Sequence, residues 1–151
     1  MDKGVIIEEL NTLLRGTYMG IRSFEHYIQK IKNPGMKKTF QKLQQQAKDN
    51  AAKIAARIQD LGGVPADSEG FTGSMHSFMH KITAPEKAAE IIHDAMEGIK
   101  KYGILYSEKL VRGDIDGDTK KFVEEVIDTY RNQLDILEKL LDACSDEQKH
   151  G

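Results

Sequence analysis

IEELNTLLRGTYMGIRSFEHYIQKI, at residues 7–31, is the stretch that decides the fold. Its apolar side chains recur at alternating spacings of three and four, which is the pattern of an amphipathic helix with one buried stripe. Thr17 lies on the same stripe as the aliphatic residues. The apolar members are Ile7, Leu10, Leu14, Ile21, Phe24, Ile28 and Ile31. A helix of this length needs other helices to cover its stripe.

Three further stripes with the same spacing follow, separated by helix-breaking residues. Asn33-Pro34-Gly35 ends the first stripe, Gly62-Gly63-Val64-Pro65 ends the second, and Gly113 ends the third. The further stripes contain Phe40, Leu43, Ala47, Asn50, Ile54, Ile58 and Leu61; Ala88, Ile92, Ala95, Ile99, Tyr102, Tyr106 and Leu110; and Val123, Val126, Tyr130, Gln133 or Leu134, Leu137, Leu140 and Cys144. We predict helices over residues 5–32, 36–61, 84–112 and 118–144.

The connections between these helices predict the topology. Two short turns imply two antiparallel hairpins, and each helix is ~40 Å long at 1.5 Å per residue. The crossover at 62–83 is long enough to run the length of the bundle and carries a short amphipathic helix. One long crossover is typical of a ferritin-like bundle. We therefore predict an all-α, antiparallel four-helix bundle that forms a single domain over 1–151.

Composition excludes several classes of function. Lys plus Arg is 22 and Asp plus Glu is 24, a formal net charge of −2, which gives no basic surface for nucleic acid. The single cysteine, Cys144, rules out an intramolecular disulfide and favours a reducing compartment. Val5-Ile6-Ile7 is too short for a signal-peptide core, and no apolar run approaches the ~20 residues of a transmembrane helix. We expect a cytoplasmic protein.

Three segments carry a resemblance to a known superfamily. They are Leu10-Asn11-Thr12-Leu13-Leu14, Tyr18-Met19-Gly20-Ile21 and Leu61-Gly62-Gly63-Val64-Pro65. With these segments and this layout, the chain resembles the ferritin-like four-helix bundles, in particular the small bacterial bundles of unknown function that are sometimes grouped with stress-response or spore-coat proteins. The resemblance implies an association with stress responses or spores and a place for two irons at mid-height.

The residues needed for two irons are not in place. Members that bind two irons supply one Glu from each of two helices and a Glu-x-x-His motif from each of the other two. The matching positions on the second helix hold Ala47 and Asn50, and the fourth helix offers Thr129 with Asn132, or Tyr130 with Gln133. Glu90, Asp94 and Glu97 fall away from the third stripe. We therefore expect no di-iron site and no cofactor.

Polar side chains stand where the ligands would be. Thr17, Asn50, Tyr102, Tyr130 and Gln133 all fall near the middle of their helices. We predict a core polar layer in which these groups satisfy one another, because an unpaired buried polar group costs roughly 1–3 kcal/mol. The alternative is that each tyrosine buries its ring and turns its hydroxyl toward solvent.

Two pairs of residues are weak candidates for a metal site of another kind. His76 and His80 have the i, i+4 spacing that places two imidazoles on one helix face, but further ligands are missing from the pattern. Glu25 and His26 lie beside the first stripe. The favoured explanation of the histidine pair is a solvated face of a short helix. The favoured explanation of Glu25 and His26 is an exposed pair or a salt bridge at the rim.

The crossover also has an apolar face, formed by Phe71, Met75, Phe78, Met79 and Ile82. Met and Phe suit adaptable contact surfaces. This face either covers its own bundle or contacts another subunit or an unidentified protein partner.

We predict a non-catalytic structural or interaction protein that self-associates, as a homo-oligomer such as a dimer, in a stress or sporulation setting that only the resemblance suggests. The alternative is a ferritin-like metal-binding protein or oxidase with an unorthodox site.

Overall fold

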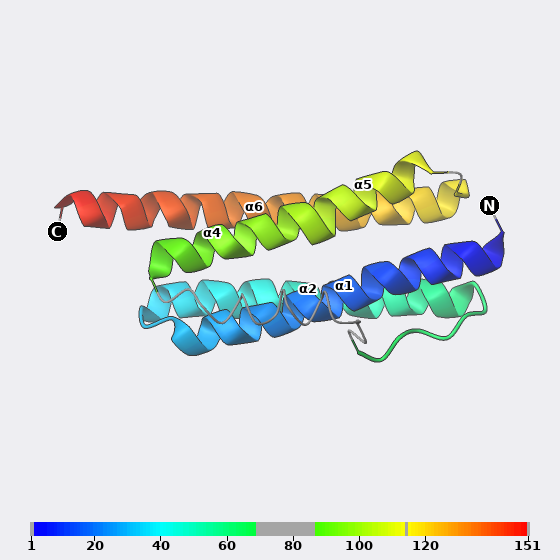
Figure 1. Ribbon diagram of the computed structural model, residues 1–151, viewed down its shortest axis with the longest axis horizontal. Helices are drawn as coiled ribbons and strands as arrows, with labels where there is room; N and C mark the ends of the chain where they lie inside the picture. Colours follow the sequence, from blue (N-terminus) through cyan, green and yellow to red (C-terminus); the bar gives the residue numbers. More distant parts are fainter. Residues whose placement is uncertain (1, 69–86, 114, 151) are drawn as a thin grey trace.

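The computed structural model describes residues 2–68, 87–113 and 115–150, and those residues form a bundle of long helices (Figure 1). The first hairpin consists of α1 (Lys3–Lys30) and α2 (Pro34–Asp60). The second consists of a third helix that is divided into α4 (Ala88–Gly98), η1 (Ile99–Ile104) and α5 (Leu105–Arg112), followed by α6 (Gly117–His150). The two hairpins pack against each other lengthwise.

The turn between α1 and α2 follows from Asn33 and Pro34. The Asn33 side chain caps α2 by accepting a hydrogen bond from the Met36 backbone N–H at 2.9 Å. Pro34 occupies the first helical position, where its missing N–H costs nothing and its fixed φ suits a helix. The second helix thus begins at Pro34, two residues before the predicted position, because the residues that break α1 also start α2.

The end of α2 is a Schellman motif, as the glycine pair predicts. The N–H of Gly63 donates to the Ile58 carbonyl at 2.9 Å, and the N–H of Gly62 donates to the Gln59 carbonyl at 2.9 Å. Gly62 has a φ of +88°, a conformation that residues with a Cβ rarely adopt. The chain therefore leaves α2 in a fixed direction.

Asn11 of α1 holds the chain that leaves α2. Its side-chain Nδ2 donates to the Val64 carbonyl at 3.1 Å, and its Oδ1 accepts from the Ala66 N–H at 2.8 Å. The Tyr18 hydroxyl donates to the Ala66 carbonyl at 3.1 Å, further along α1. We define these contacts as the Asn11 clamp. The clamp therefore fixes the path of the chain after α2 against α1.

The third helix differs from the prediction, which treated it as one uniform α-helix. At η1 the hydrogen bonding changes to the π pattern, shown by the Leu105 N–H donating to the Lys100 carbonyl. A π-turn carries one extra residue and rotates the part of the helix beyond it. The buried positions of the third helix after Ile99 are therefore Gly103, Ser107 and Leu110. Tyr102 and Tyr106, which the stripe placed inward, are only half-buried.

The turn of the second hairpin is capped as the sequence predicts, but the outer ends of its helices differ from the predicted bounds. Asp116 caps α6, because its Oδ2 accepts from the Thr119 N–H at 3.0 Å and its Oδ1 accepts from the Thr119 hydroxyl at 2.6 Å. α4 begins at Ala88, later than residue 84, and Ala88 is exposed rather than inward. α6 continues to His150, beyond residue 144, and its last turns project past the start of α4 (Figure 1).

The core is continuous along the bundle. An aromatic group fills the end of the first hairpin: the Phe24 and Tyr27 rings meet the Phe40 ring edge-on, at centroid distances of 5.9 and 6.1 Å. Stripe residues of all four helices are fully buried, among them Leu10, Leu14, Phe40, Leu43, Ile54, Ile58, Ile92, Val123 and Leu137. Within the described parts of the chain, no helix is long and apolar enough to cross a membrane.

Candidate functional site

The site is a cavity at mid-bundle, which we call the mid-bundle cavity. Its volume is about 60 Å³, and side chains of α1, α2, the third helix and α6 line it. That volume equals roughly two water molecules at ~30 Å³ each. Thr17, Ala47, Tyr102, Tyr130 and Gln133 are among the lining residues. Four of these five are polar, and all of them stand at positions that the stripes place in the centre of the bundle.

Thr17 and Tyr130 meet across the bundle. The Thr17 hydroxyl donates to the Leu13 carbonyl of its own helix at 2.9 Å, and the Thr17 and Tyr130 oxygens are 3.2 Å apart. Because the single Thr17 hydrogen is used within α1, Tyr130 is the donor in this pair. Burial raises the pKa of Tyr130, so the side chain remains a neutral phenol.

Gln133 bridges α6 to α2. Its Nε2 donates to the Leu43 carbonyl at 3.3 Å and to the Gln46 Oε1 at 3.4 Å. Both amide hydrogens therefore point toward α2. The side chain is 1% exposed.

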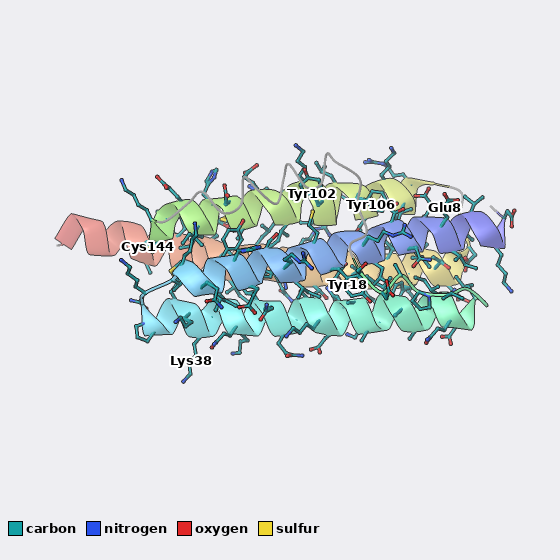
Figure 2. All side chains as sticks on the ribbon, turned by 60° about the horizontal axis from the view of Figure 1, so that its bottom comes forward. Glu8, Tyr18, Lys38, Tyr102, Tyr106 and Cys144 are labelled. Carbon is teal, nitrogen blue, oxygen red and sulfur yellow. The ribbon has the colours of Figure 1, made fainter. Side chains whose placement is uncertain are left out.

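The remaining two members of the expected layer are Asn50 and Tyr102. Asn50 is buried on α2, but it does not line the mid-bundle cavity, and its Nδ2 has no hydrogen-bond partner among the residues that the structure describes. Tyr102 lines the mid-bundle cavity from η1, and Lys101 Nζ lies 5.7 Å from the centre of its ring. Figure 2 shows Tyr102 and Tyr106 on the third helix. Within the expected layer, the structure joins Thr17 directly to Tyr130.

Tyr106 reaches α1 instead of the centre. Its hydroxyl lies 2.8 Å from a Glu9 carboxylate oxygen and 3.2 Å from the Glu9 carbonyl. Burial, followed by the hydrogen bond to Glu9, raises the pKa of Tyr106 well above its ordinary value. This contact ties α5 to α1 on the side where η1 has changed the register.

Asp94 is a charged lining residue that the stripes do not predict. It was predicted to fall away from the core, yet it is half-buried and lines the mid-bundle cavity from α4. Burial is the largest cause that raises the pKa of Asp94, and Glu90 and Glu97 act in the same direction, while His93 opposes them. Burial, with a smaller effect of the Asp94 charge, also raises the pKa of Tyr27.

Glycines on facing helices leave the space open. Gly16 and Gly20 of α1 face Gly98 and Gly103 of the third helix along the mid-bundle cavity. A Cβ on Gly16 would stand 4.0 Å from the Tyr102 carbonyl oxygen, and a Cβ on Gly103 would stand 3.2 Å from the Tyr130 ring. A Cβ on Gly20 would have no atom of the described structure within 4 Å. Gly16 and Gly20 are four residues apart, so they lie on the same face of α1.

The residues around the mid-bundle cavity do not fit two irons. Hard metal ions need carboxylate or imidazole ligands, and here the lining offers one carboxylate together with hydroxyl, amide and apolar groups. Across the described ranges 2–68, 87–113 and 115–150, no three His, Cys, Asp or Glu residues gather as a metal site would require. We therefore derive no step through a di-iron centre.

The other candidate metal residues lie away from this centre or outside the described structure. Glu25 is exposed, and its carboxylate accepts hydrogen bonds from Gln29 at 2.9 Å and from Gln44 at 3.4 Å. The bond from Gln29 is the largest cause that lowers the pKa of Glu25. His26 is half-buried beside it. His76 and His80 fall outside the described residues.

The apolar face of the crossover also falls outside the described residues, so its contacts stay a prediction. Its members are Phe71, Met75, Phe78, Met79 and Ile82.

Comparisons with known proteins support the fold. The family model described as "Domain of unknown function (DUF2383)" matches residues 5–111. A dodecameric thioferritin, the bacterioferritin-related protein from Bacteroides fragilis, superimposes with a TM-score of 0.80 at 13% identity, covering 99% of this chain and 92% of the other. A ferritin-like, diiron-carboxylate protein from Bacillus anthracis str. Ames superimposes with a TM-score of 0.72 at 21% identity, covering 93% and 99%. No curated protein sequence matches. The prediction of a ferritin-like four-helix bundle is confirmed.

Proposed function

The chain belongs to the DUF2383 family and has a ferritin-like fold, and on that basis we propose that it is a self-associating structural or interaction protein rather than a di-iron enzyme. Small bacterial bundles of this kind suggest a stress or sporulation setting, and we include that setting in the proposal. A fold hosts many functions, so the function of this chain has to be inferred from its site.

The observation that carries the proposal is the composition of the mid-bundle cavity. Two of its polar residues, Thr17 and Tyr130, are hydrogen-bonded to each other, and Thr17 also donates to the backbone of α1. A third, Gln133, donates to α2. Satisfied polar groups of this kind fix how helices pack, a role that buried polar residues have in other bundles. We infer that this centre positions the helices, and that function resides on the outer surfaces.

Two considerations support self-association. The similar protein from Bacteroides fragilis is a dodecamer, which shows that this fold can assemble. The crossover face formed by Phe71, Met75, Phe78, Met79 and Ile82 has the Met and Phe content of an adaptable contact surface. We propose this face as the contact between subunits, with a dimer as the smallest assembly.

Light scattering after size-exclusion chromatography tests the assembly. We expect the wild type to elute as a multimer and the double variant Phe78→Ser, Met79→Ser to lose mass toward the monomer. Leu105, which is 58% exposed on α5, offers the matched control Leu105→Ser. A monomeric wild type would overturn self-association. Dissociation by Leu105→Ser but not by the double variant would move the contact to the third helix.

Metal analysis of protein purified without a tag tests the other half of the proposal. We expect iron, manganese and zinc well below one ion per chain. A stoichiometric metal would favour the alternative, a ferritin-like metal protein with an unorthodox site, and loss of that metal in Glu25→Gln, His26→Ala, His76→Ala or His80→Ala variants would locate it.

A further inference from the structure

We propose that a second copy of this chain docks along α2, with a stripe of lysines on α2 of one copy lying against a stripe of carboxylates on α6 of the next. The lysine stripe consists of Lys38, Lys42, Gln45, Asp49 and Lys53. The acidic stripe consists of Glu124, Asp128, Arg131, Asp135 and Glu138. This contact rests on the self-association proposed above and supplies a second interface beside the crossover.

Each stripe occupies one exposed face of its helix. Successive members are three or four residues apart on both helices, which places each set on one side. All ten side chains are exposed, and Figure 2 shows Lys38 extending away from the bundle. Within the described residues, no carboxylate forms an ion pair with Lys38, Lys42 or Lys53. The charges of these lysines are therefore left for a group outside the described part of their own copy.

Lys38 and Lys42 repel each other on α2. They are four residues apart, and no Asp or Glu stands three or four residues from either of them along the chain. Like charges at this spacing destabilise a helix, whereas a solvated helix face typically alternates in sign. A carboxylate supplied by another copy offsets this repulsion.

The two stripes stand at matching heights in the bundle. Gln133 of α6 donates to the Leu43 carbonyl of α2 at 3.3 Å, and Arg57 of α2 donates to the Thr119 hydroxyl of α6 at 2.9 Å. The two contacts are fourteen residues apart on each helix, and the helices are antiparallel. Residue heights on α6 therefore follow directly from those on α2.

This register yields three pairs of opposite charge. Each pair lies level to within one residue, which is ~1.5 Å along a helix. The pairs are Lys38 with Glu138, Lys42 with Asp135, and Lys53 with Glu124. Between the second and third pairs, Asp49 comes opposite Asp128, whose charge is already balanced by Arg131 at 3.8 Å. The order of charges on one stripe thus complements the order on the other.

The pairs form between two copies. In one bundle α2 and α6 meet through residues outside the stripes, including Arg57 and Gln133, while the stripes are exposed to solvent. Rotation about an axis parallel to the helices keeps every residue at its height. Such a rotation brings the lysine stripe of one copy against the acidic stripe of the next with the three pairs in register.

The stripes select the neighbour and its register more than they add binding strength. Exposed ion pairs are individually weak and are screened by salt. In coiled coils, charges that flank an apolar contact set partner choice and orientation in the same way. The crossover face proposed above supplies the apolar contact, so loss of the stripes should reduce the assembly to a smaller unit.

Charge reversal tests this contact by sedimentation velocity in ~50 mM and ~500 mM NaCl. We expect the wild type to lose mass at the higher salt concentration. The variants Lys38→Glu, Lys42→Glu and Asp135→Lys, Glu138→Lys should each raise the dissociation constant at least roughly tenfold at the lower one. The quadruple variant reverses both stripes and should recover the wild-type mass, as should an equimolar mixture of the two double variants.

The control is Lys3→Glu, Lys109→Glu, which makes the same change of net charge on exposed residues outside the stripes and should assemble like the wild type. Circular dichroism checks that every variant is folded. An equal loss of mass in this control would attribute the effect to net charge and overturn the pairing. A folded quadruple variant that does not recover the mass would overturn it as well.

The same experiment separates the stripe contact from self-association itself. A multimer whose mass changes neither with salt nor in the two double variants would refute the stripe contact and leave self-association in place. A wild type that is monomeric at both salt concentrations would refute self-association, and the stripe contact with it.

Discussion

The two hairpins solve the same packing problem differently. In the first, α1 and α2 run without interruption, and large side chains such as Phe24, Tyr27 and Phe40 fill their contact. In the second, the third helix passes through the π-turn at η1, and the buried positions beyond Ile99 include Gly103 and Ser107. The mid-bundle cavity lies where the continuous helix faces the interrupted one. The difference shows that one extra residue in a helix can replace tyrosines by small residues in the core.

Phe40→Ala should have the largest effect, because it removes the centre of the continuous hairpin. The Phe40 side chain is fully buried, and two aromatic rings contact it edge-on. Truncating a buried phenylalanine costs ~3–5 kcal/mol. Urea denaturation should show the free energy of unfolding lowered by about this amount. A loss below ~1 kcal/mol would mean that the first hairpin is no better packed than the second.

Gly103→Ala tests the interrupted helix. A Cβ there would stand 3.2 Å from three atoms of the Tyr130 ring, and Thr17 holds that ring through its hydroxyl. We expect a loss of ~1–2 kcal/mol, because overpacking outweighs the gain in helix propensity. Gly20→Ala is the matched control and should gain ~0.5–1 kcal/mol, since a Cβ there meets open space. Thermal unfolding compares the two, and a stabilised Gly103→Ala would show that the ring can move.

Ser107→Ala should have a smaller effect of the opposite sign. The Ser107 hydroxyl is fully buried and has no hydrogen-bond partner among the described residues. Replacing it by a methyl group removes the cost of burying an unpaired hydroxyl, so we expect a gain of up to ~1 kcal/mol. Thr17→Val, which removes a paired hydroxyl, is the comparison and should destabilise. A destabilised Ser107→Ala would imply a partner for this hydroxyl.

The pH dependence of Asp94 should be the smallest effect. Burial raises the pKa of Asp94 above its ordinary value of 3.8, so the folded state holds the proton more tightly than the unfolded state. Stability from this group is therefore present below pH ~4 and is lost as pH rises through the raised pKa. Asp94→Asn should match the wild type in acid and exceed it at neutral pH. Parallel stability curves for the two proteins would contradict this expectation.

Much of the fold is predictable from the sequence because local rules govern it. The stripes give the helices, Asn33-Pro34 gives the first turn, and Gly62 gives the end of α2. The centre is less predictable. After Ile99, two sets of positions have helical spacing. One set is 102, 106 and 110, and the other is 103, 107 and 110. Tyrosine is a more typical core residue than glycine or serine, so the first set looks like the buried one.

The candidate site could be predicted only in part for the same reason. Thr17, Tyr130 and Gln133 lie on continuous helices, so their stripes place them at the mid-bundle cavity. Asp94 lies beside its stripe, yet it lines the space between the glycines of α1 and those of the third helix. That space depends on how closely two helices approach each other, and the stripe of one helix does not predict this approach.

The Asn11 clamp has a consequence for the order of folding. Two of its three hydrogen bonds join Asn11 to Val64 and Ala66, so they close most of the first hairpin into one loop. Contacts within a helical hairpin are closer in sequence than contacts between hairpins, and close contacts form faster. The first hairpin, closed by the clamp, is therefore expected to form before the two hairpins dock.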